Sequence, residues 1–214
     1  LEKGLPVVQI DKYFTGLEAM SVACDNYDAA FAATEYLIAL GHRRIAHITS
    51  NDTLRNVSSV SERFAGYRDA LLKNKLEFRK EYVPELTRNC VHTTMADLKL
   101  QSLGYREMSA LLKLAAPPTA VFLLFDELAV GAIHAINDNG LTVPGDISLI
   151  GVNNSEIASY LEPPLTTMAQ PIQELAVNAV GLIVDHLAGR RRDDLKVKLK
   201  TKLIVRESCR GYEA

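Results

Sequence analysis

Short apolar runs alternate with longer segments of helical periodicity along this chain, and that alternation limits its fold more than any other feature. The apolar runs predict strands at Pro6–Ile10, Ile45–Thr49, Ala120–Leu124 and Ile147–Val152. Between them, apolar side chains recur every three or four residues, which is the spacing of one helix face. Parallel strands require long crossover connections, and helices supply them. The sequence therefore predicts an α/β fold of doubly wound type, with mostly parallel sheets covered by helices on both faces.

Capping residues indicate where the helices begin and end. Starts are predicted at the Asp25–Asn26 pair, at Ser59 with Glu62 as a capping box, at Asp126 and at Pro171. Glycines that can adopt a left-handed conformation are expected to close helices at Gly41, Gly140 and Gly189.

Two regions give weaker or different signals. Tyr82–Leu86 is a possible strand, and Met95–Leu114 is compatible with one helix or with two helices broken near Gly104. Every second residue of Lys196–Leu203 is a lysine, and the residues between are apolar or, at Thr201, threonine, which predicts a strand buried on one face. Its lysines are typical of an edge strand, where charge resists pairing with other chains.

The composition excludes several classes of protein. Lys and Arg total 24 against 26 Asp and Glu, so no excess of positive charge is present to neutralise nucleic-acid phosphates. The three cysteines are odd in number and form no CxxC pair, which favours a reducing cytoplasm. The run from Leu111 to Val121 contains Lys113 and two prolines, so no membrane partner is expected. The chain opens without Met or a signal peptide, and we interpret it as a fragment.

Catalytic and metal-binding patterns are missing from the sequence. No GxSxG elbow, P-loop or GxGxxG motif occurs, and the five histidines lack HxxxH or HExxH spacing. We therefore expect no enzyme activity, no cofactor and no metal. His42, directly after a predicted helix end, is interpreted as a structural residue.

Ligands of doubly wound sheets bind beyond the carboxyl ends of the strands, which here are the positions after Ile10, Thr49, Leu124 and Val152. Asn153 stands at one such end, and its amide can both donate and accept; the alternative is a plain Asn-Asn turn. Phe125 stands at another and could stack on a sugar ring or a flat base, or simply belong to the core.

Arg63 lies in the first turns of a predicted helix, where the helix dipole disfavours a cation unless an acceptor is near. Its donors suit sugar hydroxyls or a carboxylate. The alternative is a surface arginine paired with a neighbouring acid.

Five stretches in order resemble the effector-binding core of the lactose-repressor/galactose-repressor (LacI/GalR) family. They are LGHRRIAHI at 40–48, SVSERFAGYRDAL at 59–71, FDELAVGAIHAINDNGLTVPGDISLIGVNN at 125–154, PPLTTMAQP at 163–171 and LIVRESC at 203–209. The resemblance implies a periplasmic-binding-protein-like fold, two lobes joined by a three-strand hinge, and an incomplete first lobe.

The resemblance also implies how the chain is divided. Residues 1–51 and 169–192 are expected in the amino-terminal lobe, and residues 52–168 and 193–214 in the carboxy-terminal lobe. Hinge crossings are expected near Asn51–Leu54, near Thr166–Met168 and between Gly189 and Lys196.

The function implied is that of a cytoplasmic repressor's ligand-sensing domain. Its effector would be a small molecule, and we favour a sugar. Operator DNA would be bound only through an amino-terminal helix-turn-helix absent from this chain, and a homodimer is expected. A periplasmic sugar-binding protein of a transporter, with the same fold, remains the alternative, and an enzyme of the doubly wound class is a third.

Six residues are predicted to bind the effector. The family places an effector-contacting arginine at Arg63, and at Asn153 it usually has an aspartate, so a charge is missing here. Asp28, Ser59 and Gln170 match cleft-lining positions, although each is also an ordinary cap or loop residue. Phe125 completes the set, whereas Asp126 is interpreted as a helix cap.

Overall fold

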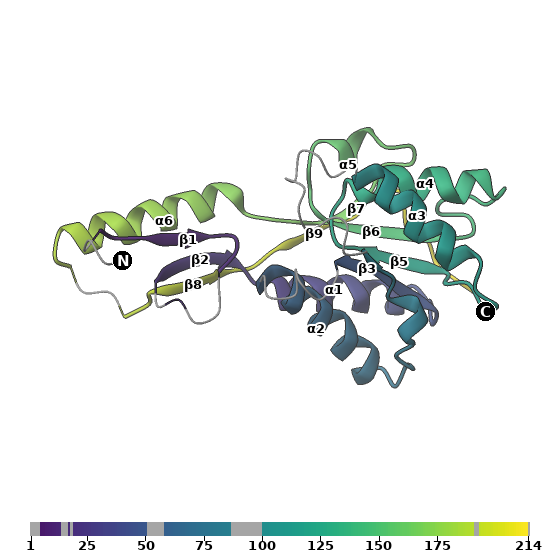
Figure 1. Cartoon of the computed structure of the whole chain (residues 1–214), viewed down its shortest axis with the longest axis horizontal. Coiled ribbons are helices and arrows are strands. Elements are labelled where there is room, and N and C mark those ends of the chain that lie inside the picture. The colour runs from purple at the N-terminus through teal and green to yellow at the C-terminus, as the bar shows by residue number, and fades with distance from the viewer. Residues whose placement is uncertain are drawn as a thin grey trace.

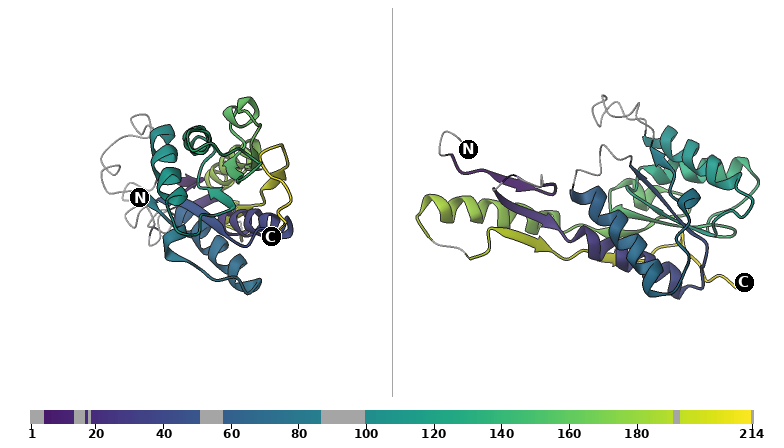
Figure 2. Two further views of the ribbon diagram at one scale, coloured as in Figure 1. Left: turned by 90° about the vertical axis from the view of Figure 1, so that its right-hand side faces the viewer. Right: turned by 60° about the horizontal axis from the view of Figure 1, so that its bottom comes forward.

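The computed structural model describes residues 5–13, 17, 19–50, 58–86, 100–190 and 193–213. They form a larger body built on a six-stranded sheet and a smaller body built on a three-stranded sheet (Figure 1). The smaller body projects from one end of the larger, so the molecule is elongated (Figure 2).

The larger sheet has the order β4-β3-β5-β6-β7-β9. Its strands are β4 (Glu85–Leu86), β3 (Ile45–Ser50), β5 (Ala120–Leu123), β6 (Ser148–Asn153), β7 (Thr166–Ala169) and β9 (Lys202–Ile204). All neighbouring pairs are parallel except β7 and β9, which are antiparallel. The predicted parallel α/β architecture is confirmed.

Helices cover both faces of this sheet. Alternate residues of β5 separate two cores: Phe122 joins a cluster with α1 (Asn26–Ala39) and α2 (Ser58–Lys73), whereas Val121 and Leu123 join one with α3 (Leu100–Leu112) and α4 (Leu128–Asp138). This division follows from the two-residue period of a strand. A short helix, α5 (Ile157–Tyr160), and a 3-10 turn (Lys80–Tyr82) complete the larger body.

The smaller sheet has the order β1-β2-β8 and is parallel throughout. It consists of β1 (Val8–Ile10), β2 (Met20–Cys24) and β8 (Lys196–Leu199), with α6 (Ile172–Leu187) packed along it (Figures 1 and 2). Its core is small: Met20, Val22 and Cys24 contact Leu175, Ala179 and Leu182.

The chain passes between the bodies three times; the passage expected near Thr166–Met168 lies close to its predicted position, and the other two differ from our expectation. The passages lie between β2 and α1, between β7 and α6, and between β8 and β9. Residues 26–50, expected in the first lobe, belong to the larger body because Ala33 and Leu37 of α1 are buried against its sheet and α2. The passage expected at Asn51–Leu54 falls on residues outside the described part of the chain.

The third passage also divides the alternating lysine segment. We predicted one strand at Lys196–Leu203, but β8 pairs with β2 in the smaller sheet and β9 pairs with β7 in the larger. Two residues, Lys200 and Thr201, separate them. Both strands lie at a sheet edge, as the lysines indicated.

The predicted caps of α1 are confirmed. The Asp25 side chain accepts a hydrogen bond from the Asp28 N–H at 3.0 Å. At the other end, Gly41 has φ +96°, and the N–H groups of Gly41 and His42 donate to the carbonyls of Ile38 and Leu37, which is the Schellman arrangement.

Two other predicted caps are wrong, because tertiary partners hold the side chains. Glu62 does not close a capping box; its Oε1 accepts from Tyr13 and Lys198. Asp126 does not cap α4, whose N-cap is Glu127 without a side-chain bond. The Asp126 carboxylate instead binds Ser155 and Thr167.

The helix α3 runs through Gly104 without a break over its described residues. A Cβ at Gly104 would collide with the Leu128 carbonyl of α4, and one at Gly131 would collide with the Gln101 carbonyl of α3. The glycines therefore allow close contact of the two helices rather than ending one of them.

Candidate functional site

A cavity of about 490 Å³ lies where the two bodies meet. This volume is within the range of small-molecule sites. The residues lining it end or follow β1, β5, β6 and β7 or stand on the helices α2 and α6: Asp11, Lys12, Ser59, Arg63, Phe125, Glu127, Asn153, Asn154, Ser155, Gln170 and Ile172. Both bodies contribute, and the strand-end positions named from the sequence supply much of the wall.

Five of the six residues singled out in the sequence line this cavity. They are Arg63, Asn153, Phe125, Ser59 and Gln170. Asp28 is not among the lining residues; it is an exposed member of the first turn of α1. The expected division of the chain had placed Asp28 in the first lobe, across the cavity from Arg63. Because α1 belongs to the larger body, Asp28 lies in the same body as Arg63 instead.

Arg63 is buried, with 2% of its surface exposed. Its Nε donates to Asn26 Oδ1 at 2.9 Å and its Nη1 to the Leu124 carbonyl at 2.7 Å. The guanidinium carbon lies 5.7 Å from the centroid of the Phe125 ring, within cation–π range. These contacts fix the guanidinium at the cavity wall.

Burial lowers the pKa of Arg63 to about 10, while the negative charges of Asp11 and Asp126 oppose that change. The side chain is therefore still a cation at neutral pH. A desolvated cation beside a cavity attracts acceptor oxygens more strongly than one in water.

Asn153 ends β6 in an unusual backbone conformation, with φ +120°, and Asn154 follows with φ +55°. The Asn153 Oδ1 accepts from Gln170 Nε2 at 3.1 Å, and Asn154 Oδ1 accepts from Arg206 Nη2 at 2.7 Å. The strand tip is thus a held turn whose amides face the cavity region, rather than a free loop.

Asp11 and Lys12 line the cavity but were not named from the sequence. Asp11 follows β1 directly, has φ +66°, and its buried Oδ1 lacks a hydrogen-bond partner among the described residues. The strand-end rule had indicated the position after Ile10, so the signal was present. With Glu127 and Arg63, these residues give the wall two acids and two bases.

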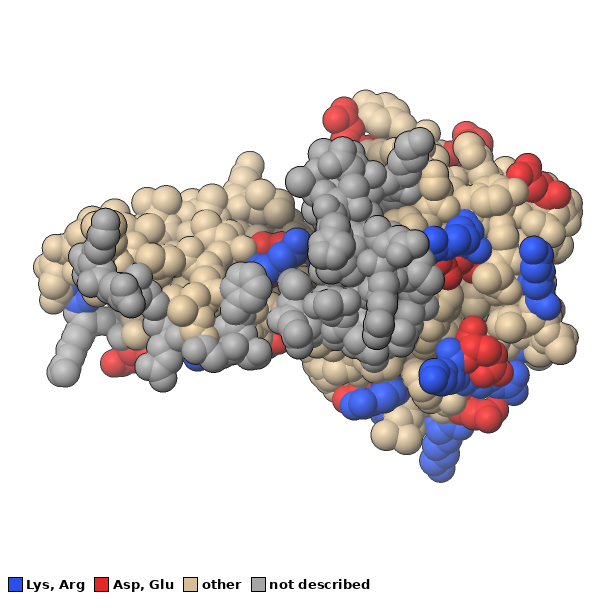
Figure 3. All heavy atoms as spheres, in the orientation of Figure 1, with Lys and Arg blue, Asp and Glu red and all other residues tan. Residues whose placement is uncertain are grey.

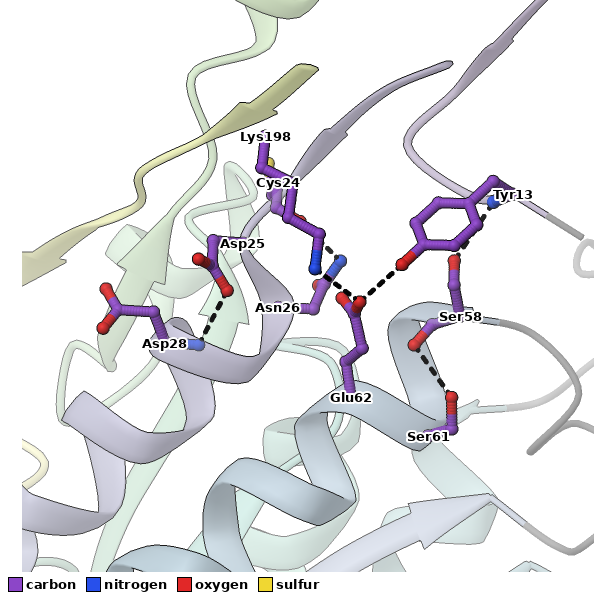
Figure 4. Close-up of polar contacts among 9 residues, drawn as sticks. All are labelled: Tyr13, Cys24, Asp25, Asn26, Asp28, Ser58, Ser61, Glu62 and Lys198. Atoms are coloured by element: carbon purple, nitrogen blue, oxygen red, sulfur yellow. Dashed lines mark hydrogen bonds and ion pairs between the residues drawn. The ribbon is translucent and has the colours of Figure 1, made fainter. Parts of the chain in front are cut away.

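A polar contact beside the cavity joins the bodies, as Figure 4 shows. The Tyr13 hydroxyl donates to Glu62 Oε1 at 2.6 Å, and Lys198 Nζ lies 2.7 Å from the same oxygen. The Tyr13 N–H also donates to Ser58 Oγ at 3.0 Å. Tyr13 follows β1 and Lys198 belongs to β8, both in the smaller body. Ser58 and Glu62 lie in the first turns of α2, in the larger body. We call this set the Glu62 contact.

His42 lies at the amino ends of the strands, opposite the cavity. It is 1% exposed, with Nδ1 3.0 Å from Thr119 Oγ1 and Nε2 3.0 Å from Ser148 Oγ. Its structural role is confirmed. Among the described residues, no group of three His, Cys, Asp or Glu side chains is placed to hold a metal ion.

On the face shown in Figure 3, positive and negative side chains of the described residues are interspersed over the larger body. Within the described ranges, no helix combines the length and apolarity that crossing a membrane would require.

The fold is that of a periplasmic-binding-protein-like domain, and a family model of that description matches residues 34–209. The chain belongs to this domain family, with relatives that are repressors of the LacI family. The ribose operon repressor of Haemophilus influenzae is 33% identical over 204 residues, which are 95% of this chain and 57% of that protein.

Solved structures agree with this assignment. A LacI-family regulatory protein from Chloroflexus aggregans matches with a TM-score of 0.85 and 28% identity, over 97% of this chain and 70% of that one. A LacI-family regulator from Enterococcus faecium, with bound ribose, matches with a TM-score of 0.81 and 27% identity, over 99% and 73%. The chain spans somewhat more than half the length of the curated relatives it matches.

Proposed function

We propose that this chain is the effector-sensing part of a cytoplasmic transcription repressor, which binds a small sugar or related metabolite without turning it over. The observation that carries the proposal is the cavity at the junction of the two bodies, with Asp11 and Lys12 on one side and Arg63 and Asn153 on the other. The names of the relatives, including the ribose operon repressor, support the same function.

The cavity wall suits a neutral polyhydroxylated ligand. Two acids and two bases leave it without a large net charge, and the amides of Asn153 and Gln170 can exchange hydrogen bonds with hydroxyl pairs. Phe125 offers an aromatic surface to the apolar C–H face of a sugar ring.

The proposed response is a shift in the arrangement of the bodies. A ligand that contacts both sides favours the arrangement in which both sides reach it, and it can shift the equilibrium only by its difference in affinity for the two states. Three chain passages and the Glu62 contact are the connections that such a shift would change. A helix-turn-helix outside this chain would read operator DNA, and a homodimer would couple two such heads.

Calorimetry with D-ribose, followed by a panel of pentoses, hexoses, disaccharides and nucleosides, tests the proposal. We expect saturable binding of one class of compound, weakened by Asn153→Ala and by Gln170→Ala. A ligand at 100 times its dissociation constant should also stabilise the fold by about 2.7 kcal/mol. Product formation from any bound compound, or no binding across the panel, would contradict the proposal.

A transporter's sugar-binding protein has the same fold, but the relatives found are repressors. Expression of the full-length gene product followed by cell fractionation separates the two functions. A periplasmic location would favour the transporter.

A further inference from the structure

Asp126 is a fully buried carboxylate directly behind the cavity wall. Its Oδ1 accepts from Thr167 Oγ1 at 2.7 Å. Its Oδ2 accepts from the Ser155 N–H at 2.8 Å and from Ser155 Oγ at 3.3 Å. One side chain thereby joins the end of β5 to β7 and to the turn that follows β6.

The bond to Thr167 extends further, to the neighbouring residue of the same turn. The Asn154 N–H donates to Thr167 Oγ1 at 3.3 Å. Because the Thr167 hydroxyl donates its proton to Asp126, its oxygen is oriented to accept from Asn154. Asp126 thus holds Ser155 directly and Asn154 through Thr167.

The turn that Asp126 holds is strained and lines the cavity. Asn153 and Asn154 both have positive φ, which residues with a Cβ adopt at a cost unless surrounding contacts enforce it. Asn153, Asn154 and Ser155 are all wall residues. A change in this turn therefore changes the positions of three groups that a ligand would meet.

Space for the carboxylate is provided by Gly151, where a Cβ would collide with Asp126 Oδ1. Three donors compensate part of the cost of burying the charge, because bonds to an ionised acceptor are stronger than neutral ones. Within the described residues, Asp126 forms no ion pair at short range; Arg63 of α2 is the cation whose charge reaches it, and Glu127 is the neighbouring acid.

We propose that Asp126 is a positioning residue of the ligand site, whose ionised carboxylate holds the Asn153–Ser155 turn in the conformation that presents Asn153 to the cavity. This inference rests on the proposed function for its consequence in binding, although its structural part does not. It predicts that ligand affinity falls when the carboxylate is protonated.

The protonation range follows from the surroundings of the carboxylate. Burial raises the pKa of Asp126 to about 6, Glu127 adds to the increase, and the bonds from Thr167 and Ser155 oppose it. Below this value, the carboxyl is mostly neutral, and a neutral carboxyl accepts hydrogen bonds more weakly than a carboxylate. The bonds from Ser155 and Thr167 should then weaken.

Amide hydrogen exchange of the whole chain, followed by NMR, tests the inference without any ligand. Asp126→Asn keeps the shape but places an NH2 donor among the three donors. We expect the Asn154 and Ser155 amides to exchange about tenfold faster or more at pH 7, the loss of one bond to a charged acceptor. In the unchanged protein the same amides should become less protected between pH 7 and pH 5, after correction for intrinsic exchange, and in Asp126→Asn this change should vanish.

Asp146→Asn is the matched control. Asp146 also accepts from a turn, through the Thr142 N–H and Oγ at 2.8 Å each, but it lies before β6, away from the cavity wall. It should leave exchange at Asn154 and Ser155 unchanged. Thr167→Val should deprotect Asn154 more than Ser155, whereas Thr167→Ser, which keeps the hydroxyl, should preserve both.

Calorimetry with D-ribose, or with the panel compound that binds best, measures the consequence. We expect an affinity loss of about tenfold in Asp126→Asn and none in Asp146→Asn. Unchanged exchange at Asn154 and Ser155 in Asp126→Asn would overturn the inference. If that variant does not fold, the pH dependence of exchange in the unchanged protein decides instead. Failure of every compound to bind the unchanged protein would contradict the proposed function and leave the exchange result standing by itself.

Discussion

Lys198 Nζ lies 2.7 Å from Glu62 Oε1, so an ammonium of the smaller body meets a carboxylate of the larger body (Figure 4). Glu62 is the immediate neighbour of Arg63 and stands one turn after Ser59, and both of these residues line the cavity. The same turn of α2 therefore carries the contact between bodies and part of the cavity wall.

Glu62→Gln should change the arrangement of the two bodies without unfolding either. The substitution removes the charge that attracts Lys198 and weakens the acceptor of Tyr13. The side chain of Lys198 is 47% exposed and that of Glu62 is 18% exposed, so the expected loss in the free energy of unfolding is below about 1 kcal/mol. Small-angle scattering should report a broader or more open ensemble, and 1 M salt should reduce the difference from the unchanged protein.

Glu35→Gln is the control for this prediction. Glu35 pairs with Lys73 at 3.0 Å, but both residues stand on helices of the larger body. Its scattering profile should match that of the unchanged protein. Identical profiles for Glu62→Gln and Glu35→Gln would contradict a role for Glu62 in setting the arrangement.

Arg63→Ala should lower stability as well as remove a cavity donor. The sequence predicted Arg63 only as an effector-binding residue or, alternatively, as a paired surface arginine. In the structure, however, the guanidinium satisfies Asn26 Oδ1 and the Leu124 carbonyl in a buried setting. Leaving such acceptors unpaired costs about 1–3 kcal/mol. Urea denaturation measures the loss.

Arg68→Ala provides the comparison on the same helix. Arg68 is half exposed and pairs with its neighbour Asp69, so its removal should change the free energy of unfolding by less than about 0.5 kcal/mol. Equal losses for both variants would show that Arg63 is not a structural residue.

Local patterns predicted the elements well and the polar contacts poorly. Asp25 and Gly41 cap α1 as predicted, because a cap depends on atoms a few residues away. Glu62 and Asp126 have equally good cap spacing, but they bind partners up to 136 and 41 residues away, which no local pattern contains. When the fold brings a charged partner or several donors close to such a carboxylate, the carboxylate binds them instead of capping its helix.

The division into bodies shows the same limit. The segment Lys196–Leu203 has one unbroken period, and only pairing with two different sheets reveals that it is two strands. The resemblance placed Asp28, with residues 1–51, in the first lobe, and nothing local tells which sheet α1 covers. The cavity residues after β5 and β6 could be predicted from the sequence, because the rule that ligands bind at the carboxyl ends of strands depends on topology alone.

Gly104→Ala should destabilise the contact between α3 and α4. Although alanine favours helices, its methyl group would collide with the Leu128 carbonyl, and the helices must separate. Overpacking of this kind costs about 1–3 kcal/mol. Ser102→Ala, at an exposed position of the same helix, should be neutral or slightly stabilising. Thermal unfolding of the two variants separates packing from propensity.

The contribution of His42 to the free energy of unfolding should fall as the pH drops below about 6.5, the ordinary pKa of histidine. Burial lowers the pKa of His42, and the positive charges of Arg210 and Arg43 act in the same direction, whereas the hydrogen bond that the imidazole donates to the Arg210 carbonyl opposes this change. The unfolded chain therefore binds a proton first. Stability from His42 is complete above the unfolded pKa and is lost as pH falls through the folded pKa, by at most about 1.4 kcal/mol per pH unit.

Asp126 affects the pH dependence of stability in the direction opposite to His42. Burial raises the pKa of Asp126 to about 6, so the folded state takes up its proton before the unfolded chain does as the pH falls. Its protonation adds stability as pH falls from 7 toward 4, even while it loosens the turn at the cavity. Urea midpoints from pH 7.5 to 5 should thus fall least steeply in His42→Gln and most steeply in Asp126→Asn, with His134→Gln, at an exposed site of α4, following the unchanged protein. Equal slopes in all four proteins would show that neither buried group titrates differently on folding.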